Sequence, residues 1–414
     1  MTPLPVAVWV RYSERAFAFN FIAFSFVMFS CGFPTGFSAT FSTLAFLFAL
    51  PIFFYRFALI ELSLVEQAGL LLFGWLTLSI VWSQTALLDS VGYLSEYRIY
   101  FMLPVFITAL TLNEKTQRLS IYAAIAGALF ALIASYGLGL GWLKVEGANF
   151  SLANRIYHGF IMSSFLLLSL LIARERLGIT RVLALIVALL IVFNVLIIET
   201  GRTGYLQIFI VLFVFGLLSF PFKIFLKLFF LLGFIFTGLY IFFDRFQTRI
   251  NETIINIERS IDGDNLHTST GQRFEFYRGA LAISSENLVA GVGVGDVTSA
   301  LEQGTASGKI RLKTDNVHNE FLNMLLAGGL PGLTLFVGFL GTIGFVGFST
   351  RRISEGLGDM MIGLLAVISV AALFNSTIKD YGEKHALIVM LSIIGSQLRS
   401  LKSFSVRGNG RIHG

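Results

Sequence analysis

Residues 223–243 read KIFLKLFFLLGFIFTGLYIFF, and the chain then changes abruptly to DRFQTRINET at 244–253. The first segment is long and apolar enough to cross a bilayer as a helix. The second opens a polar stretch, 244–318, that is rich in Arg, Asp and Gly and ends in NVHNE at 316–320, before another apolar run. It is the only long stretch that cannot lie in hydrocarbon. We therefore expect a membrane protein with one large loop, and we expect its work to be done there.

The composition of the chain indicates a protein that lies mostly within a membrane. The 414 residues are 56% hydrophobic and 13% charged, with a mean hydropathy of +0.80. Ordinary soluble domains carry about 25% charged residues, so a polytopic protein in contact with membrane lipids is predicted. The net charge of +6 is modest, and no run of Lys or Arg resembles a nucleic-acid-binding arm. A single cysteine, Cys31, excludes an intramolecular disulfide.

Twelve apolar runs are candidates for membrane-spanning helices. They lie at about 16–33, 38–56, 67–82, 97–112, 119–142, 157–173, 181–199, 203–220, 223–243, 319–348, 359–377 and 384–398. The first lacks a small-residue cleavage site and is expected to remain as an anchor. Helix breaks are predicted at 138–141 (LGLG) and at Gly328-Gly329, before Pro331. The predicted fold is an all-α polytopic membrane protein with about 12 transmembrane helices, divided into 1–243, a partly helical loop at 244–318, and 319–414.

The charges of the loops predict how the chain is oriented. One set of alternate loops carries Lys or Arg at 11, 15, 56, 115, 118, 174, 176, 181, 223, 227, 351 and 352, and the tail adds more from 399 on. The short loops of the other set are nearly neutral. The positive-inside rule therefore predicts that both termini are cytoplasmic and that the loop 244–318 faces outward. Because the outer side has no ATP pool, nucleotides are not expected there, and GVGVGD at 291–296 is interpreted as a tight turn.

Arg202 is the first candidate for binding an anionic substrate. It lies in ETGRTG at 199–204, at the outer junction of two apolar runs. Glycine on either side would let a diphosphate approach the backbone, and a guanidinium offers a fork of donors. The alternatives are an interfacial arginine and a residue that Glu199 neutralises.

Arg273 and Arg278 are two further cationic candidates, in GQRFEFYRGALA at 271–282. Phe274, Tyr277 and Leu281 recur there at helical spacing, and Phe276 and Ala280 widen the apolar strip, which predicts an amphipathic helix lying over the membrane part. Arg273 lies near the start of this helix and is the better phosphate candidate. For Arg278, pairing with Glu275 is the alternative.

His318 is the candidate general base, because it lies at the bilayer edge and an imidazole has an unperturbed pKa of ~6.5. A lone histidine is more often structural, and His158 at another outer edge is the runner-up. The outer side has no closely spaced His/Cys cluster. The acidic turn at 262–265 (DGDN) fails the calcium-loop pattern beyond its first acids. No metal site is therefore predicted.

Several of these motifs resemble those of a known family. RTGY at 202–205 opens a helix, GQR at 271–273 and GVG at 291–293 lie in the large loop, and HNEFL at 318–322 precedes GGLPG at 328–332. In this order they resemble the O-antigen ligase/polymerase superfamily over about 199–338. The stretch NSTIKD at 375–380 is similar to the outer junction before the family's last helix, which adds Asp380 as a candidate.

The resemblance implies a glycosyltransferase of the bacterial inner membrane with a periplasmic active site, no cofactor and no metal. The donor would be a glycan on undecaprenyl diphosphate, and in the ligase branch the acceptor is a sugar hydroxyl of lipid A–core. Arg202 and Arg273 would hold the diphosphate, while His318 takes the acceptor proton in an inverting displacement. Orientation of the substrates would fall to Arg278, Asn319 and Asp380.

The His-Asn element favours the ligase branch, but other functions are compatible with the motifs. The alternatives within the superfamily are an O-antigen polymerase and a protein O-oligosaccharyltransferase. From a different class, a transporter of lipid-linked glycans would also have twelve helices. It would be expected to carry charges at mid-membrane and two related halves, whereas most charges here lie at the edges of the apolar runs.

Overall fold

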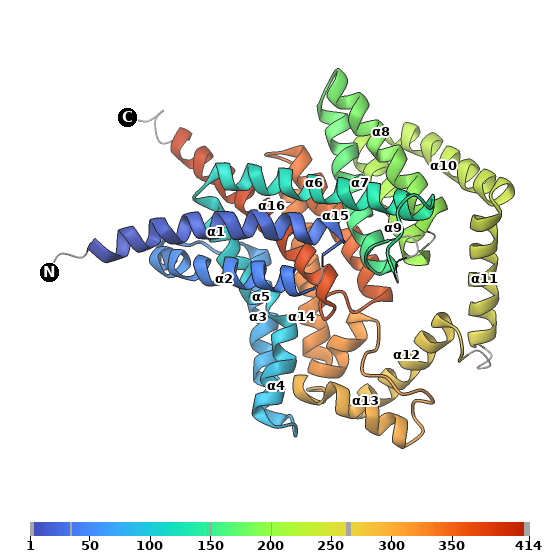
Figure 1. Cartoon of the computed structure of the whole chain (residues 1–414). Helices are drawn as coiled ribbons and strands as arrows, with labels where there is room; N and C mark the ends of the chain where they lie inside the picture. The colour runs from blue at the N-terminus through green and yellow to red at the C-terminus, as the bar shows by residue number, and fades with distance from the viewer. Residues whose placement is uncertain are drawn as a thin grey trace.

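The structure is a computed structural model that describes residues 4–33, 35–146, 148, 151–199, 201–261 and 266–409 (Figure 1). Apart from an isolated bridge between Val145 and Ala148, the regular structure of these residues is helical. The helices are α1 (Leu4–Ser30), α2 (Thr35–Arg56), α3 (Leu64–Leu78), α4 (Leu87–Leu94), α5 (Ile99–Thr111), α6 (Glu114–Gly139), α7 (Arg155–Glu175), α8 (Ile179–Phe193), α9 (Arg202–Ser219), α10 (Phe222–Phe242), α11 (Asp244–Ile261), α12 (Ser269–Glu286), α13 (Val297–Ala306), α14 (Glu320–Thr350), α15 (Glu355–Phe374) and α16 (Tyr381–Asn409). Short turns of other helix types are η1 (Phe57–Leu59), η2 (Ser79–Trp82), η3 (Ser95–Tyr97), the π-helical η4 (Asn194–Glu199) and η5 (Val294–Asp296). The predicted all-α class is confirmed.

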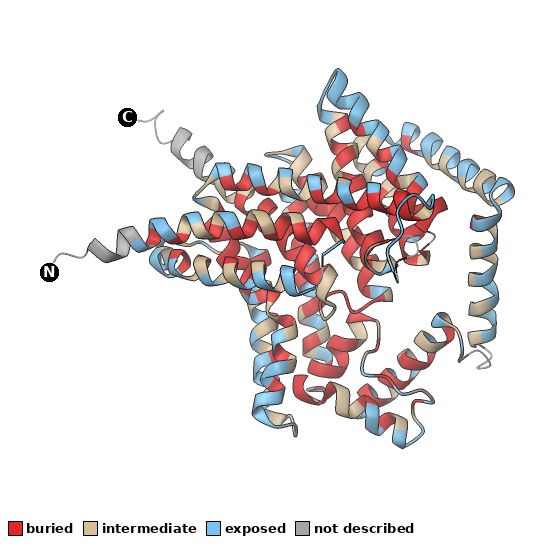
Figure 2. Cartoon of the chain, viewed as in Figure 1, coloured by how far each residue is buried: buried red, intermediate tan, exposed pale blue. Residues whose placement is uncertain are grey.

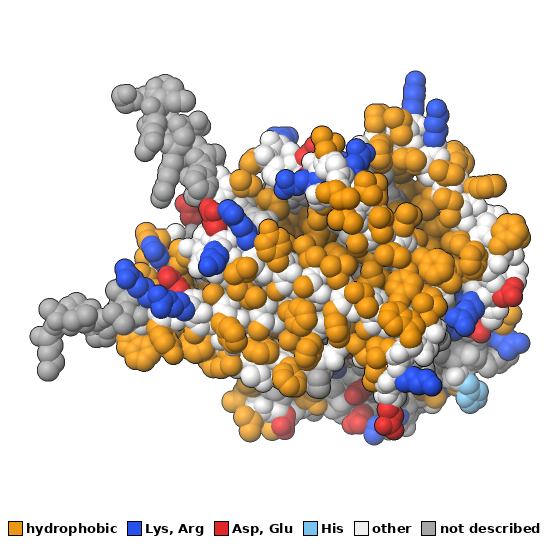
Figure 3. Space-filling model, turned by 45° about the horizontal axis from the view of Figure 1, so that its top comes forward, with side chains coloured by type: hydrophobic (Ala, Val, Ile, Leu, Met, Phe, Trp, Pro, Cys, Tyr) orange, Lys and Arg blue, Asp and Glu red, His pale blue; other side chains and the backbone are white. Residues whose placement is uncertain are grey.

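Nine of the described helices are long and apolar enough to cross a membrane. They are α2, α3, α6, α7, α8, α9, α10, α14 and α15, counting the short turns that continue α2, α3 and α8. Figure 3 shows apolar side chains over most of the visible face, with Lys, Arg, Asp and Glu gathered towards its edges. The chain is therefore a multi-pass membrane protein, as predicted. The number twelve stays a prediction, because α1, α5 and α16 are not among these nine.

The short helix α5 lies inside the bundle. Its 13 residues extend about 20 Å at 1.5 Å per residue, less than the hydrocarbon core of roughly 30 Å. Nearly every residue from Ile99 to Leu110 is buried, and the helix packs against α2, α3 and α16. Because protein surrounds it, its length need not match the lipid. Figure 2 shows the buried residues in the middle of the bundle and exposed ones along α4, α10 and α11.

Polar contacts gather one set of helix ends on the side opposite the large loop. Asp359 at the start of α15 is buried and pairs with Arg174 at 2.5 Å and with Arg351 at 2.7 Å. Buried Glu66 at the start of α3 pairs with Arg399 of α16 at 2.7 Å. All five residues belong to the set of alternate loops that is rich in Lys and Arg, or lie next to it. The positive-inside rule predicted that these loops share one side of the membrane.

The other helix ends meet on the side that carries residues 244–318, which we name the loop side. The carboxylate of Asp296 accepts the backbone N–H groups of Gln84 and Thr85 at 2.6 and 2.8 Å. The ammonium group of Lys384 donates to the carbonyl of Glu96 at 2.9 Å. The contacts thus separate the junctions into the two predicted sets. Which set faces the cytoplasm stays a prediction.

A glycine turn holds the large loop on the bundle. The N–H groups of Val292 and Gly293 donate to the carbonyls of Leu326 and Ala327 in α14, at 2.8 and 3.0 Å. These contacts meet α14 where it is kinked at Gly329, which has φ +65° and ψ −160°. The predicted break at Gly328-Gly329 is therefore confirmed. So is the predicted tight turn, because Gly293 has φ +93°.

The helix predicted over 271–282 exists as part of α12, but its packed face differs from the predicted one. Phe276 and Ala280 are buried, whereas Phe274 and Leu281 are exposed. The reason is that the chain after α13 packs against α12 on the face that carries Gly279. A Cβ atom at Gly279 would lie 2.2 Å from the Ile310 side chain.

Substitution of Gly329 by alanine is expected to destabilise the protein. A Cβ atom there would lie 2.7 Å from the backbone N of Gly291, and the conformation itself costs a non-glycine residue on the order of 1–3 kcal/mol. Thermal unfolding of the detergent-purified protein, followed by tryptophan fluorescence, should show a lower Tm. Gly338→Ala on the same helix is the control, because its Cβ atom meets nothing within 4 Å. Equal Tm values for the two variants would contradict this account of the kink.

Candidate active site

His318 occupies the last turn of the loop before α14, in a backbone conformation that favours glycine. Its φ is +56°, and such a conformation costs on the order of 1–3 kcal/mol unless neighbouring contacts enforce it. The side-chain carbonyl of Asn316 accepts the His318 N–H at 3.0 Å, and the Tyr277 hydroxyl donates to the His318 carbonyl at 3.1 Å. The loop and α12 therefore hold His318 from two directions.

The imidazole of His318 lies among polar groups of the α15–α16 junction. Burial lowers the pKa of His318 below its ordinary value, and the charge of Arg273 lowers it further. The charge of Asp380 and a hydrogen bond that the imidazole donates to the Asn375 side chain act in the opposite direction. The net effect favours the neutral imidazole at neutral pH, which is the form that can accept a proton.

Asp380 faces the same histidine. Burial raises the pKa of its carboxyl group, while His318 and the side chain of Asn375 lower it. Asn375 thus interacts with both titratable groups and lies between them. Asn316 adds a long hydrogen bond of 3.4 Å from its Nδ2 atom to Asp380. Asn375 belongs to the stretch 375–380 singled out in the sequence, although only Asp380 was proposed there.

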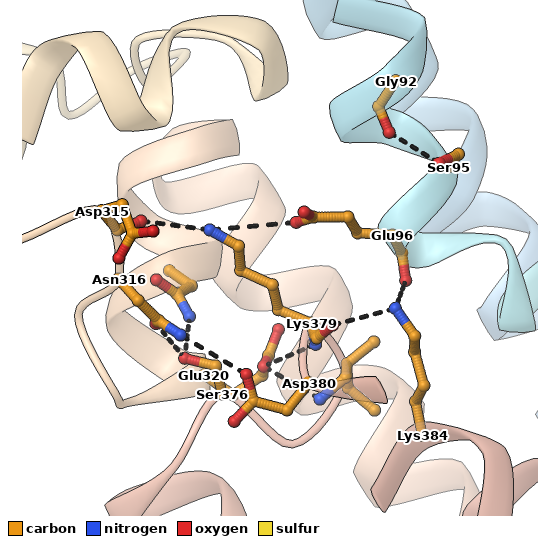
Figure 4. A network of polar contacts seen from close by, with 12 residues as sticks. Gly92, Ser95, Glu96, Asp315, Asn316, Glu320, Ser376, Lys379, Asp380 and Lys384 are labelled. Carbon is orange, nitrogen blue, oxygen red and sulfur yellow. Dashed lines mark hydrogen bonds and ion pairs between the residues drawn. The ribbon is translucent and has the colours of Figure 1, made fainter. Parts of the chain in front are cut away.

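A buried polar network fixes this junction in place (Figure 4). Glu320, the first residue of α14, is fully buried and accepts the N–H groups of Ile378 and Lys379 at 3.0 and 3.4 Å. The ammonium group of Lys379 reaches across to Glu96 at 3.8 Å and donates to the carbonyl of Asp315 at 3.1 Å. The network ties α14, the α15–α16 junction and η3 together around His318 and Asp380.

Arg273 lies in the second turn of α12 and is only partly exposed. In the part of the chain that the structure describes, no carboxylate pairs with it, and its guanidinium makes no hydrogen bond. Burial lowers its pKa, and its charge acts both on His318 and on Arg202. The charge of Arg273 therefore acts on each of the other two residues proposed for catalysis, and a shared site for the three stays a prediction.

Arg202 is the first residue of α9, directly after Gly201, and it contacts the large loop. Its guanidinium donates to the Thr270 hydroxyl at 2.7 Å and pairs with Glu252 of α11 at 3.7 Å, while its buried Nε atom has no partner among the described residues. The predicted alternative that Glu199 neutralises Arg202 is wrong. Glu199 is buried beneath Gly201 and interacts with Arg155 and Arg249 instead.

A cationic recess next to Arg202 was not predicted. It has a volume of about 290 Å³, and its lining includes Arg155, Arg245 and Arg249 together with Glu252. The charge of Arg249 acts on Arg202. The spacing of Arg245 and Arg249 was a usable signal, because residues four apart lie on the same face of a helix. Their proximity to Arg155 required the tertiary structure.

Arg278 makes the alternative contact predicted for it. Its side chain is largely exposed and pairs with Glu275 at 2.8 Å, and Arg311 pairs with the same carboxylate at 2.9 Å. Burial opposes ionisation of Glu275, but the hydrogen bonds from Arg278 and Arg311 outweigh it and lower the pKa of Glu275 to about 2. Arg311 therefore joins the chain after α13 to α12, whereas the pair of Arg278 and Glu275 lies within α12. A role of Arg278 in substrate binding stays a prediction.

The side chain of Asn319 makes hydrogen bonds to backbone groups of two helices. Its Oδ1 atom caps α14 by accepting the N–H of Leu322 at 3.0 Å, and its Nδ2 atom donates to the carbonyl of Leu373 at 3.0 Å. These bonds join the start of α14 to the end of α15. Asn319 therefore positions its neighbour His318, and contact with a substrate stays a prediction.

His158, the runner-up for the base, is buried in α7. Its Nε2 atom lies 3.0 Å from Oδ1 of Asn194 in the π-helical turn, and Asn194 donates to Ser135 at 2.9 Å. These contacts give His158 a structural role between α6, α7 and η4. His385 of α16 is likewise buried, with Arg98 and the carbonyl of Tyr381 as partners.

Metal binding was considered for the acidic turn at 262–265, which lies outside the described residues. Among the described residues, no group of three or more His, Cys, Asp or Glu side chains is placed to hold a metal ion. Metal independence of the site stays a prediction.

One comparison with known proteins gives a match. Residues 185–337 match a family model described as O-Antigen ligase. The matched segment contains Arg202, Arg273 and His318, and it ends before Asn375 and Asp380. No curated protein matches the chain.

Acylation of His318 by diethyl pyrocarbonate, measured by mass spectrometry across pH, is expected to show a midpoint below ~6.5, the ordinary value for histidine. The reagent attacks the neutral imidazole, and burial and Arg273 disfavour the protonated form. Asp380→Asn should move the midpoint lower, because Asp380 raises the pKa of His318. The same peptide in denaturant supplies the reference. A midpoint above that of the denatured peptide would contradict the description of this site.

Proposed function

The chain belongs to the O-antigen ligase/polymerase superfamily, as its segment 185–337 indicates, and we propose that it is an O-antigen ligase. Members of this family are glycosyltransferase-like enzymes. The proposed reaction moves a glycan from undecaprenyl diphosphate to a sugar hydroxyl of lipid A–core. It inverts the anomeric carbon in one displacement and needs no metal, cofactor or nucleotide.

The observation that supports the proposal is that the charge of Arg273 acts both on His318 and on Arg202. An arginine that is largely removed from water but has no carboxylate partner is costly unless an anion completes its surroundings. Two guanidinium groups near a neutral histidine are the arrangement that a diphosphate-linked donor requires. Gly201 does not leave the expected room for a diphosphate, because a Cβ atom there would lie 2.9 Å from the Glu199 carboxylate. The arginine side chains themselves are therefore proposed to bind it.

In the proposed mechanism His318 takes the proton of the acceptor hydroxyl as that oxygen attacks the anomeric carbon of the donor. The new glycosidic bond forms while the bond from that carbon to the diphosphate oxygen breaks. The imidazolium is stabilised by the charge of Asp380, which already acts on His318 in the free protein. The proton finally leaves with the diphosphate or passes to water.

The leaving group determines what the arginines must do. Negative charge develops on the bridging oxygen as the bond to the sugar breaks, and donors placed in advance for that charge lower the barrier. Arg273 and Arg202 are proposed to provide these donors. Arg249 in the neighbouring recess is proposed to hold the second phosphate group or the approaching lipid headgroup.

The loop side is proposed to face the periplasm from a bacterial inner membrane, with both termini in the cytoplasm. The basis is the excess of Lys and Arg on the opposite set of loops. The periplasm has no ATP pool, so the reaction needs a donor that is already activated. The diphosphate of the lipid-linked glycan provides this activation.

Transfer by the purified protein tests the function. A labelled glycan on undecaprenyl diphosphate is incubated with and without lipid A–core, and products are separated by gel and mass spectrometry. The ligase is expected to form product only when lipid A–core is present. Longer lipid-linked glycans in its absence would identify a polymerase instead, and transfer to protein hydroxyls would identify an oligosaccharyltransferase. Absence of any transfer would contradict all three.

Two further results bear on the mechanism. A chelator should leave transfer unchanged; strong inhibition reversed by a divalent ion would refute the metal-free reaction. Full transfer by His318→Ala at a normal membrane level would refute the assignment of the base.

Arg273→Lys is expected to reduce kcat/KM by about 10²-fold, by analogy with the loss of one donor to developing charge. Lysine keeps the charge but lacks the planar fork of donors. Exposed Arg259→Lys on α11 is the control, and its activity should stay near that of the wild type. A separate variant, Arg278→Lys, tests whether Arg278 binds substrate or only pairs with Glu275. A large loss of activity without a change in Tm would support contact with the substrate. Near wild-type activity of Arg273→Lys would refute fork-like binding of the diphosphate.

A further inference from the structure

A second pocket opens on the loop side, at the far end of α12 from Arg273. One wall is the segment 82–85 that follows α3, and the other consists of the end of α12, the glycine turn and α13. Its volume is about 660 Å³. The lining includes Trp82, Gln84, Asn287, Asp296, Gln303 and Ser307.

The two walls are joined by fixed contacts. Asp296 holds the backbone of Gln84 and Thr85, and Ser83 Oγ accepts the N–H of Gly295 at 3.2 Å. The approach is so close that a Cβ atom at Gly295 would lie 2.2 Å from Ser90 Oγ. The pocket is therefore formed in advance and does not depend on a ligand for its shape.

The chemistry of the lining is that of amides and hydroxyls. The side chains of Gln84 and Gln303 are exposed and make no hydrogen bond within the described chain. The indole N–H of Trp82 is shielded and has no partner among the described residues. The two glutamine amides can donate to and accept from hydroxyl groups. The indole of Trp82, which packs against Trp75 at a ring-centroid distance of 5.7 Å, adds an apolar surface to the lining.

The charges of the lining argue against a phosphate ligand. Lys309 is the only cation in the lining, and it is paired with Glu286 at 2.6 Å. The remaining charge is the carboxylate of Asp296, whose oxygens accept backbone N–H groups. A pocket with excess negative charge and several free amides selects a neutral, hydroxyl-rich ligand.

We propose that this pocket is a subsite for neutral oligosaccharide, which binds sugar units remote from the reacting bond; this rests on the proposed glycan transfer. The 13-residue separation of Arg273 and Glu286 along α12 corresponds to about 20 Å. The pocket therefore lies well away from the proposed diphosphate site. Contacts to remote sugars supply binding energy that is the same in the bound substrate and in the transition state, so they lower KM. The sugars come from either the donor glycan or the acceptor core, and the two sources are separated by experiment.

The test uses free oligosaccharides that carry no diphosphate. O-antigen glycan and core oligosaccharide, each released by mild acid from lipopolysaccharide of the bacterium that encodes this chain, are titrated onto the full-length protein in nanodiscs. Binding is measured by saturation-transfer NMR. At least one should bind the wild type, and Gln84→Ala/Gln303→Ala should raise its Kd at least about fivefold, the loss expected for two hydrogen bonds. The identity of the bound oligosaccharide decides between donor and acceptor.

Gln247→Ala on α11 is the matched control, because it removes the same side chain outside the pocket. It should bind oligosaccharide like the wild type. In the transfer assay the double variant should raise KM for the substrate that carries the bound sugars and leave kcat nearly unchanged.

The proposal is overturned if neither oligosaccharide binds, if the double variant binds as well as the wild type, or if Gln247→Ala weakens binding equally. Displacement of the oligosaccharide by inorganic diphosphate would also overturn it, because the ligand would then occupy the arginine site. Oligosaccharide binding by a protein that transfers no glycan would refute the ligase function and support the subsite.

Discussion

The contact between the glycine turn and the kink of α14 governs the arrangement of the loop side. Backbone N–H groups of Val292 and Gly293 bond to carbonyls that the kink at Gly329 releases from the helix. Only glycine permits this approach, because a Cβ atom at Gly291 or Gly329 would meet backbone atoms within 2.7 Å. The contact anchors the end of α12, and α12 in turn places Arg273 at one of its ends and the second pocket at the other. A loop without this anchor would have no defined position relative to α9 or α14.

The site that results is electrostatically unbalanced. Arg249 and Arg273 each repel Arg202, and the acid nearby, Glu252, is shared between Arg202 and Arg249. The tertiary contacts of α9, α11 and α12 hold these cations together against that repulsion. Beside them, burial keeps the imidazole of His318 neutral. An anionic ligand would relieve the repulsion, and this is the physical basis for the diphosphate site proposed near His318.

Strain and buried charge are concentrated around the same histidine. His318 combines a left-handed backbone with contacts from Asn316 and Tyr277, and the fully buried Glu320 follows two residues later. Such features cost stability and persist where the surrounding structure over-determines them. Here the surroundings come from α12, α14 and the α15–α16 junction, so the arrangement depends on segments as far apart as 273 and 380.

Composition and hydrophobic periodicity were sufficient to predict the helical class, the large loop, the break at Gly328-Gly329 and the turn at 291–296. Lipid imposes long apolar runs, and a kink or tight turn needs glycine wherever it occurs, so these features are local. The packed face of α12, the pairing of Arg278 with Glu275 and the partner of Arg202 were left open or predicted wrongly, because helical spacing does not reveal which neighbour a face meets. Asn375 and the cationic recess around Arg249 were missed for the same reason. Only the tertiary structure couples Arg273 to both His318 and Arg202, since electrostatic coupling depends on distance in space rather than on separation along the chain.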